Sequence, residues 1–310
     1  MRIRTEAVGI RGGRVRWFLL IAAVVLLSAC HPGYYEAKDL RDDCQDGVSE
    51  ACNAFGQKLL KGEYVLRDEA GAARSFTQAC DANLGDSCAR LGVLYQDGAG
   101  VERDSTQALA LFQKACGANA MDGCARLGVR YLRGAGVPRD TTRAAVLFEQ
   151  ACTGDNLTGC AWLGTLHETG QGVAQDANRA AELFQRSCDG KVAIGCVGLG
   201  RLHSTGAGVA RNDSIATELF ERACEADEAD GCFHLGTQYA LGKGVEADYN
   251  QAARHYRHAC DDRHAEACYA LSGLYQTGQG VWRQPERAEA MARRACELGY
   301  TDACPRPKGS

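Results

Sequence analysis

The stretch Cys88-Ala-Arg-Leu-Gly-Val-Leu-Tyr-Gln-Asp-Gly-Ala-Gly-Val-Glu-Arg-Asp104, continued by Ser-Thr-Gln-Ala-Leu-Ala-Leu-Phe-Gln-Lys-Ala-Cys116, recurs along the chain. Its period is 36 residues, since the cysteine that ends it returns at this interval from Cys80 to Cys296. A fixed period of this length is typical of a solenoid, in which each unit buries its apolar face against its neighbours. We therefore expect the 310 residues to form one elongated array.

Each repeat is predicted to begin with a helix. Cys88, Leu91, Gly92 and Tyr95 stand at i, i+3, i+4 and i+7, which places them on one helical face. A glycine in the middle of a helix lowers its stability, so Gly92 and its equivalents are expected to allow a partner helix to approach closely. Gly98 then ends the helix as a left-handed cap.

The second helix of the repeat is predicted to begin after Asp104, whose carboxylate can accept backbone N–H bonds as an N-cap. Ala108 and Phe112 lie on its expected buried face. The equivalents of the cap are Asp68, Asp140, Asp176, Asn212 and Asp248. In the last repeat Gln284 takes this position, and atypical terminal units are expected where one side has no neighbour.

Sixteen of the 17 cysteines form eight pairs with the same spacing. The pairs are Cys44/Cys52, Cys80/Cys88, Cys116/Cys124, Cys152/Cys160, Cys188/Cys196, Cys224/Cys232, Cys260/Cys268 and Cys296/Cys304. An antiparallel pile of helices also allows pairing across a repeat, Cys52 with Cys80, but that scheme leaves Cys44 and Cys304 without partners. We therefore predict disulfides between cysteines eight apart. The spacing does not fit a zinc site, so no metal and no cofactor are expected.

The N-terminus is predicted to be an export signal. Five arginines precede an apolar run of ten residues, Phe18 to Leu27, which is too short for a permanent membrane span. The following Leu27-Ser28-Ala29-Cys30 resembles the bacterial lipobox, so cleavage before Cys30 and diacylation of this odd cysteine are expected. The alternative is an ordinary signal peptide cleaved elsewhere, with Cys30 as a free thiol. His31, in place of Asp, favours sorting to the outer membrane, facing the periplasm.

The domain organisation follows from these boundaries. We expect a lipoprotein signal peptide over 1–29, a lipidated tether and N-terminal cap helix over 30–43, seven 36-residue repeats with a terminal disulfide cap over 44–304, and a tail over 305–310. Loss of the signal, with five arginines and one glutamate, would leave a formal net charge of −8. A chain of this charge without a basic patch is not expected to bind nucleic acid.

The motifs Leu91-Gly92, Gly98-Ala-Gly100-Val101 and Ala108-to-Cys116 resemble the Sel1-like repeat. The added cysteine pair is similar to the cysteine-rich branch typified by the Helicobacter cysteine-rich proteins. The resemblance implies an all-α fold, a right-handed α/α superhelical solenoid of TPR-like repeats. It also implies binding or scaffolding in exported or membrane-associated assemblies. Some members of that branch are described as slow β-lactamases or penicillin binders, which implies an alternative activity and a β-lactam or peptidoglycan-related ligand.

The residues give little support for catalysis. A serine β-lactamase needs Ser-x-x-Lys and a downstream Lys-Thr-Gly, and neither motif occurs in the sequence. His255 and His258, one helical turn apart, are interpreted as part of a solvated face. His167 and His203 occupy the Tyr95 position and are expected to pack like aromatic residues with one hydrogen bond each.

The candidate partner-binding residues lie on the first helices, opposite the expected buried face, where the repeats differ from one another. First helices generally line the concave surface of such solenoids. The candidates are Arg90, Arg126, Trp162, Arg201 and His234. Trp162 with Arg126 on the preceding repeat has the composition of an interface hot spot; the alternative is that these are unselected surface residues. The sequence thus predicts a lipid-anchored scaffold for a protein or peptide partner.

Overall fold

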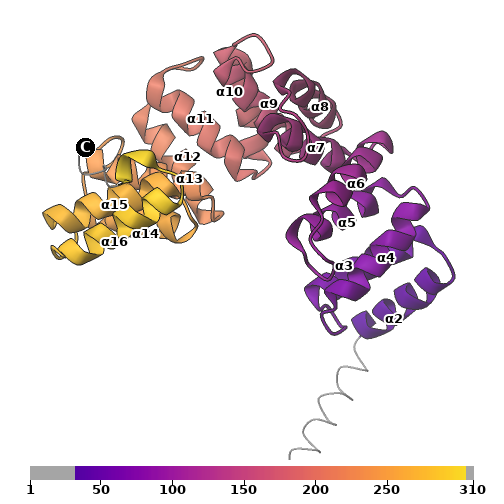
Figure 1. Cartoon of the computed structure of the whole chain (residues 1–310). Helices are drawn as coiled ribbons and strands as arrows, with labels where there is room; N and C mark the ends of the chain where they lie inside the picture. Colours follow the sequence, from indigo (N-terminus) through magenta and orange to yellow (C-terminus); the bar gives the residue numbers. More distant parts are fainter. Residues whose placement is uncertain (1–31, 305–310) are drawn as a thin grey trace, which may run out of the picture. The chain divides into compact units, whose positions relative to one another are not determined.

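The computed structural model describes residues 32–304, and throughout this range the regular structure is helical (Figure 1). The signal peptide, the lipid site at Cys30 and the tail over 305–310 lie outside the described residues. None of the helices within the range has the length and apolar character needed to cross a membrane.

Seven helix pairs follow one another along the described chain, each with a first and a second helix of 13 residues. The first helices are α3 (Ser49–Lys61), α5 (Gly85–Asp97), α7 (Met121–Arg133), α9 (Leu157–Thr169), α11 (Ala193–Thr205), α13 (Ala229–Leu241) and α15 (Ala265–Thr277). The second helices are α4 (Glu69–Asp81), α6 (Ser105–Gly117), α8 (Thr141–Thr153), α10 (Ala177–Asp189), α12 (Asp213–Glu225), α14 (Tyr249–Asp261) and α16 (Pro285–Glu297). The helix α2 (Pro32–Gln45) precedes the pairs and the short 3-10 helix η1 (Thr301–Ala303) follows them.

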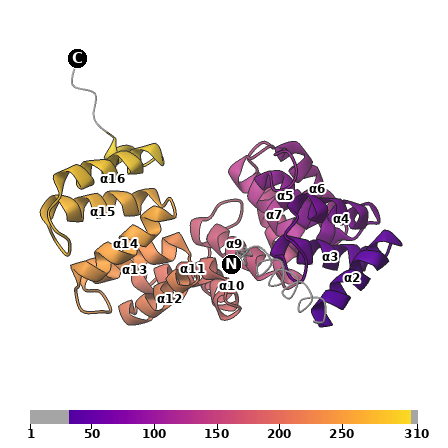
Figure 2. The same cartoon turned by 90° about the horizontal axis from the view of Figure 1, so that it is seen from below.

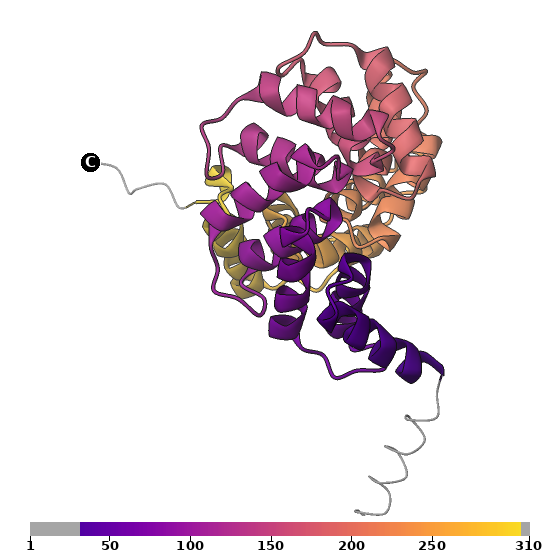
Figure 3. The ribbon, with the colours of Figure 1, turned by 90° about the vertical axis from the view of Figure 1, so that its right-hand side faces the viewer.

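The chain divides into two compact units, Met1–Gly123 and Cys124–Ser310, with the boundary inside α7. In the first unit α2 packs on α3, and α3 to α6 follow as successive neighbours (Figure 3). In the second unit each first helix packs against its own second helix, as α15 and α16 do in Figure 2. Each unit is thus a stack of helix pairs whose core runs from pair to pair.

The predicted helix ends are confirmed. The Asp104 carboxylate accepts hydrogen bonds from the backbone N–H groups of Thr106 at 2.8 Å and Gln107 at 3.0 Å, and the five equivalents predicted from the sequence cap their helices in the same way. Gln284 makes no such bond, and α16 instead begins with a proline. Gly98 has φ of 73°, the left-handed conformation expected of the cap.

The mid-helix glycines make room for a buried phenylalanine, as expected for a close approach of two helices. A Cβ atom at Gly200 of α11 would lie 2.6 Å from Cε1 of Phe220 in α12, and Gly128 and Phe148 have the same relation in α7 and α8. Phe148 and Phe220 are at most 1% exposed. The paired helices therefore approach at a distance that a larger residue would not permit.

The second glycine of the turn between the two helices connects neighbouring repeats. A Cβ atom at Gly208 would overlap the backbone of Ala177 at the start of α10, one repeat earlier, and Gly244 has the same relation to Asp213. The pattern of the sequence did not predict this contact. The structure adds a contact between the turn of one repeat and the second helix of the preceding one.

The disulfides join cysteines eight residues apart, as predicted. Disulfide bonds of this kind join Cys44–Cys52, Cys80–Cys88, Cys152–Cys160, Cys188–Cys196, Cys224–Cys232, Cys260–Cys268 and Cys296–Cys304. Cys116 and Cys124 are also disulfide-bonded. Cys80 lies in α4 and Cys88 in α5, so the bond joins the second helix of one repeat to the first helix of the next. Each such bond restricts the unfolded chain where two repeats meet.

Candidate functional site

In the second unit the first helices lie close to one another. α11 contacts both α9 and α13, whereas the second helices α10, α12 and α14 make no comparable contacts among themselves within the described residues. In a curved stack the layer with the closer spacing lies on the inside. The first helices therefore line the concave side of this unit, which is the surface that repeat proteins use for partners.

Trp162 of α9 lies on this side but belongs partly to the core. Its ring is half-buried and stacks on Phe148 of α8, with ring centroids 6.1 Å apart and planes inclined by 17°. The guanidinium carbon of Arg133 lies 5.8 Å from the centre of the Trp162 ring, a cation–π contact that the sequence did not reveal. The expectation that this row lies opposite the buried face is wrong for Trp162.

Gly198 and His234, which stand 36 and 72 residues after Trp162 and form one row with it, also cover a phenylalanine. His234 of α13 stacks on Phe220 at 4.8 Å between ring centroids, and a Cβ atom at Gly198 would press against the ring of Phe184. The physical reason is that each phenylalanine of a second helix lies between two successive first helices. It meets the mid-helix glycine of its own repeat on one side and the row residue of the next repeat on the other.

The arginines of the predicted set differ in their surroundings. Arg90 of α5 is exposed, Arg126 of α7 is partly buried, and Arg201 of α11 forms an ion pair with Glu168 of α9. In this pair Nη2 of Arg201 lies 2.5 Å from Oε2 of Glu168 and Nε lies 3.3 Å from Oε1, so both carboxylate oxygens are engaged. The pair joins the first helices of two consecutive repeats on the concave side.

A second polar cluster surrounds His234. Desolvation by burial lowers the pKa of His234 to about 4, and the positive charge of Arg201 acts in the same direction. Nε2 of His264 lies 3.1 Å from Oδ1 of Asp230, and this hydrogen bond lowers the pKa of the Asp230 carboxyl. Because Nδ1 of His264 accepts the backbone N–H of Ala267, its proton resides on Nε2 and is donated to Asp230.

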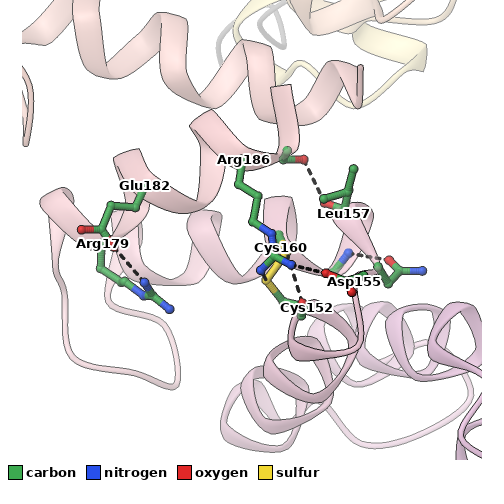
Figure 4. The surroundings of a disulfide bond; sticks show 10 residues. Cys152, Asp155, Leu157, Cys160, Arg179, Glu182 and Arg186 are labelled. Carbon is green, nitrogen blue, oxygen red and sulfur yellow. Dashed lines mark hydrogen bonds and ion pairs between the residues drawn. A yellow bond between two sulfur atoms is a disulfide. The ribbon is translucent and has the colours of Figure 1, made fainter. Parts of the chain in front are cut away.

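A polar side chain near the end of the second helix reaches back to the disulfide loop of the preceding repeat. Nη2 of Arg186 lies 2.5 Å from Oδ1 of Asp155, next to the Cys152–Cys160 bond, and the hydroxyl of Ser187 donates to the carbonyl of Leu157 at 2.8 Å (Figure 4). The equivalent residues Gln78, Arg222 and Arg294 donate to carbonyl oxygens of their preceding loops. This position therefore satisfies backbone acceptors where two repeats meet.

His258 occupies this position in α14, and its ring lies next to the sulfur atoms of the Cys224–Cys232 disulfide. Its Nδ1 atom lies 3.3 Å from Sγ of Cys232 and 3.9 Å from Sγ of Cys224, and Nδ1 of His255 lies 3.8 Å from Sγ of Cys224. Both imidazoles are partly buried, and burial lowers the pKa of His255. The expected solvated face holds in part for His258, whose side chain is 43% exposed, but both rings also lie against the disulfide because α14 packs on the loop that carries it.

A pocket of about 520 Å³ opens beside these two histidines. It is lined by Glu221, Cys224, Glu225, Leu235, Tyr239, Gln251, Arg254, His255 and His258. The ring of His255 stacks on that of Tyr239 with centroids 5.6 Å apart and planes inclined by 7°, which fixes its orientation. This pocket was not predicted from the sequence.

The other histidine pair agrees with its prediction. Nδ1 of His167 lies 3.2 Å from the carbonyl oxygen of Ala174, and Nδ1 of His203 lies 3.1 Å from that of Ala210. Each imidazole therefore makes one hydrogen bond to the turn of its own repeat.

The family model described as Sel1 repeat matches residues 85–119, 122–156, 158–191, 193–228, 229–264 and 265–300. The chain belongs to the Sel1 repeat family. Six repeats are matched, and the helix pair α3–α4 before them has the same cap and the same disulfide spacing. No curated protein gave a significant match.

Solved structures confirm the Sel1 solenoid. A protective antigen of uropathogenic Escherichia coli with an SLR fold, c5321, is 25% identical with a TM-score of 0.60; the match covers 86% of this chain but only 57% of that one. A Sel1 repeat protein from Oxalobacter formigenes is 19% identical with a TM-score of 0.66, covering 84% and 98%. The Helicobacter pylori cysteine-rich protein B is 28% identical, covering 42% and 93%, with a TM-score of 0.35. The cysteine-rich type itself is shown by the disulfide that recurs at the repeat boundaries.

The β-lactamase alternative gains no support from the described residues or from these relatives. It depended on family resemblance alone, and the Ser-x-x-Lys and Lys-Thr-Gly motifs of a serine β-lactamase do not occur in the sequence. The chain is a Sel1 repeat scaffold whose fold suits protein interaction.

Proposed function

We propose that this protein is an exported, lipid-anchored scaffold that binds a peptide or protein segment on the concave side of its first helices at the cell envelope. The observation that carries the proposal is the concave side of the second unit, where Trp162 of α9 and His234 of α13 occupy equivalent positions and Arg201 lies on the intervening first helix α11. An aromatic ring followed by an ion-paired arginine and an imidazole on the next two first helices suits an extended partner, which would meet one repeat after another.

Trp162 is the proposed anchor. Stacking on Phe148 leaves part of its ring accessible and fixes the orientation of that part, so little side-chain freedom remains to be lost on binding. The ion pair between Arg201 and Glu168 fixes the position of the Arg201 side chain on α11, the first helix of the next repeat. Arg126 extends the proposed surface onto α7 of the same unit, and Arg90 is the proposed binding residue of the first unit.

The proposed location has two supports. Disulfides at successive repeat boundaries suit an oxidising compartment outside the cytoplasm. The lipobox resemblance around Cys30 favours a lipid anchor, with the signal peptide over 1–29, the tether and cap helix over 30–43, seven repeats over 44–304 and a tail over 305–310. In this proposal the lipid on Cys30 inserts into the periplasmic side of the outer membrane.

Partner capture tests the binding surface. The anchored protein is purified from detergent-solubilised envelopes, and co-purified proteins are quantified by mass spectrometry for the wild type, Trp162→Ala and Trp282→Ala. Trp282 is 87% exposed in the turn before α16, so its removal controls for the loss of a tryptophan elsewhere. We expect capture to fall at least about tenfold for Trp162→Ala and to be unchanged for Trp282→Ala. Equal capture by both variants would exclude this surface.

The anchor is tested separately. Mass spectrometry of the mature N-terminus should find an acylated Cys30, and Cys30→Ser should release the protein from the membrane fraction. A mature chain that begins at another residue, without lipid, would contradict the anchor and leave the binding surface open to its own test.

A further inference from the structure

The disulfide Cys224–Cys232 has neighbours that differ in kind from those of the other described disulfides. Two positions of the next second helix, three residues apart, lie at the repeat spacing from those that contact a disulfide elsewhere in the chain, as Arg186 contacts Cys152 and Leu219 packs with Cys188 and Cys196. They are Leu183 and Arg186 in α10, and Leu219 and Arg222 in α12. In α14 both positions are histidine, His255 and His258. The repeat thus brings two imidazoles to a pair of sulfur atoms.

Three of the four side chains already have the spacing of a metal site, because Sγ of Cys224, Sγ of Cys232 and a ring nitrogen of His258 all lie within 4.8 Å of one another, and His255 lies beside them. Nδ1 of His258 lies 3.3 Å from Sγ of Cys232 and 3.9 Å from Sγ of Cys224, and Nδ1 of His255 lies 3.8 Å from Sγ of Cys224. In a tetrahedral zinc site with ordinary Zn–S and Zn–N bonds, a sulfur and a nitrogen ligand are separated by about 3.5 Å. The measured distances lie on both sides of this value.

The outer contacts of His258 also match a metal site. Its Nε2 atom, on the far side of the ring from the sulfurs, lies 3.5 Å from Oδ1 of Asp227 and 3.7 Å from Oδ2 of Asp262. A carboxylate on the second nitrogen is the usual partner of a histidine metal ligand, because it fixes the tautomer that leaves Nδ1 free to bind. The pocket beside His255 and His258 gives an ion access from solvent.

We propose that reduction of Cys224–Cys232 creates a Zn²⁺ site formed by Sγ of both cysteines and Nδ1 of His255 and His258. The bonded sulfurs of the disulfide are poor ligands, so the oxidised protein lacks the site. A dithiol reductant donates two electrons and two protons: the Cys224–Cys232 bond breaks, two thiols form, and the reductant becomes a disulfide. Zn²⁺ then displaces both thiol protons to solvent and binds two thiolates and two neutral imidazoles. The site is independent of the proposed partner surface.

Cobalt reports both the geometry and the ligands. The full exported chain is reduced with a dithiol, freed of it without air, and titrated with Co²⁺, while oxidised protein is titrated in parallel. Tetrahedral Co²⁺ with thiolate ligands gives intense visible bands and sulfur charge-transfer absorption, which a site of imidazoles and water does not give. We expect one equivalent of tetrahedral Co²⁺ in the reduced protein, displaced by Zn²⁺, and none in the oxidised protein.

The matched variant is His255→Leu/His258→Arg, which introduces the residues that α10 and α12 carry at these positions and keeps every cysteine. It should melt within a few degrees of the wild type when oxidised and should lose the tetrahedral spectrum when reduced. Asp227→Asn removes one outer carboxylate, and its left-handed φ of 58° suits asparagine. We expect it to weaken Zn²⁺ binding about tenfold.

Alkylation mapping locates the ion and remains informative if reduction loosens the fold. Zn²⁺ should protect Cys224 and Cys232 from alkylation, but not Cys188 and Cys196, whose neighbours are Leu219 and Arg222. Equal alkylation of both pairs would overturn the proposal. Co²⁺ binding of equal stoichiometry in the reduced wild type and the double variant would also overturn it, as would a spectrum that is the same with the disulfide intact.

Discussion

The guanidinium of Arg201 forms a bidentate ion pair with the carboxylate of Glu168, which joins two consecutive first helices. Nη2 lies 2.5 Å from Oε2 and Nε lies 3.3 Å from Oε1. The side chains are only 33% and 20% exposed, so water screens this pair less than a fully exposed one. The two-point contact also fixes the spacing of the helices α9 and α11 on the concave side.

A double-mutant cycle should measure this pair. We expect Glu168→Gln and Arg201→Gln each to lower the free energy of unfolding by about 1 kcal/mol, and the double variant to lose less than the sum. Urea unfolding followed by circular dichroism gives the coupling energy. Strict additivity would mean that the two charges do not stabilise each other.

Trp162→Ala should destabilise the protein as well as weaken partner capture. The ring covers Phe148, which is fully buried, so its removal exposes apolar surface and breaks the stack. A loss of about 2 kcal/mol is expected, measured by urea unfolding. Trp162→Phe keeps a ring on Phe148 and should recover most of the stability. If Trp162→Ala leaves the unfolding midpoint unchanged, the stack contributes nothing.

Stability should decrease as the pH falls from about 6.5 toward 4 because of His234. Its folded pKa of about 4 lies below the ordinary value of 6.5, so in this window the unfolded chain binds a proton that the folded chain does not. The unfolding free energy should fall by up to about 3 kcal/mol. His234→Phe keeps the stack on Phe220 and removes the titration, so its pH dependence should be weaker by that amount. Parallel curves for the two proteins would contradict the assignment.

Two glycines on first helices should respond oppositely to alanine. At Gly200 the added Cβ atom would lie 2.6 Å from the Phe220 ring, so Gly200→Ala should cost about 1–3 kcal/mol. At Gly273 of α15 nothing lies within 4 Å, so Gly273→Ala should raise stability by about 0.5–1 kcal/mol through the unfolded chain. Thermal melts of both variants test the pair, and a stabilising Gly200→Ala would show that the ring can move aside.

Local features of the fold were predictable from the sequence because their interactions join residues close together in the chain. Asp104 caps the helix that begins one residue later, and Cys80 bonds to Cys88 across one short loop. The helical solenoid follows from repetition of the same pattern. Even the deviation at Gln284 was expected from its place at the end of the array.

The surroundings of the site residues were harder to predict because they depend on the next repeat. Trp162 was expected to be exposed because the helical pattern places it opposite the apolar stripe of its own helix, yet Phe148 of the preceding second helix contacts its ring. His258 looked solvated for the same reason, although it packs on a disulfide 26 residues earlier in the chain. A helical pattern assigns each residue to a face of its own helix, and the contacts between repeats decide what that face meets.

The phenylalanines that lie between successive first helices limit how the concave surface can change during evolution. In the second unit the residues known to cover such a ring are Trp162, Gly198 and His234: two flat rings and one residue without a side chain. A substitution that favours a new partner at these positions must also remain compatible with the ring beneath it. New specificity should therefore arise more readily at neighbouring positions such as Arg201, while the row over the phenylalanines stays restricted to planar or very small residues.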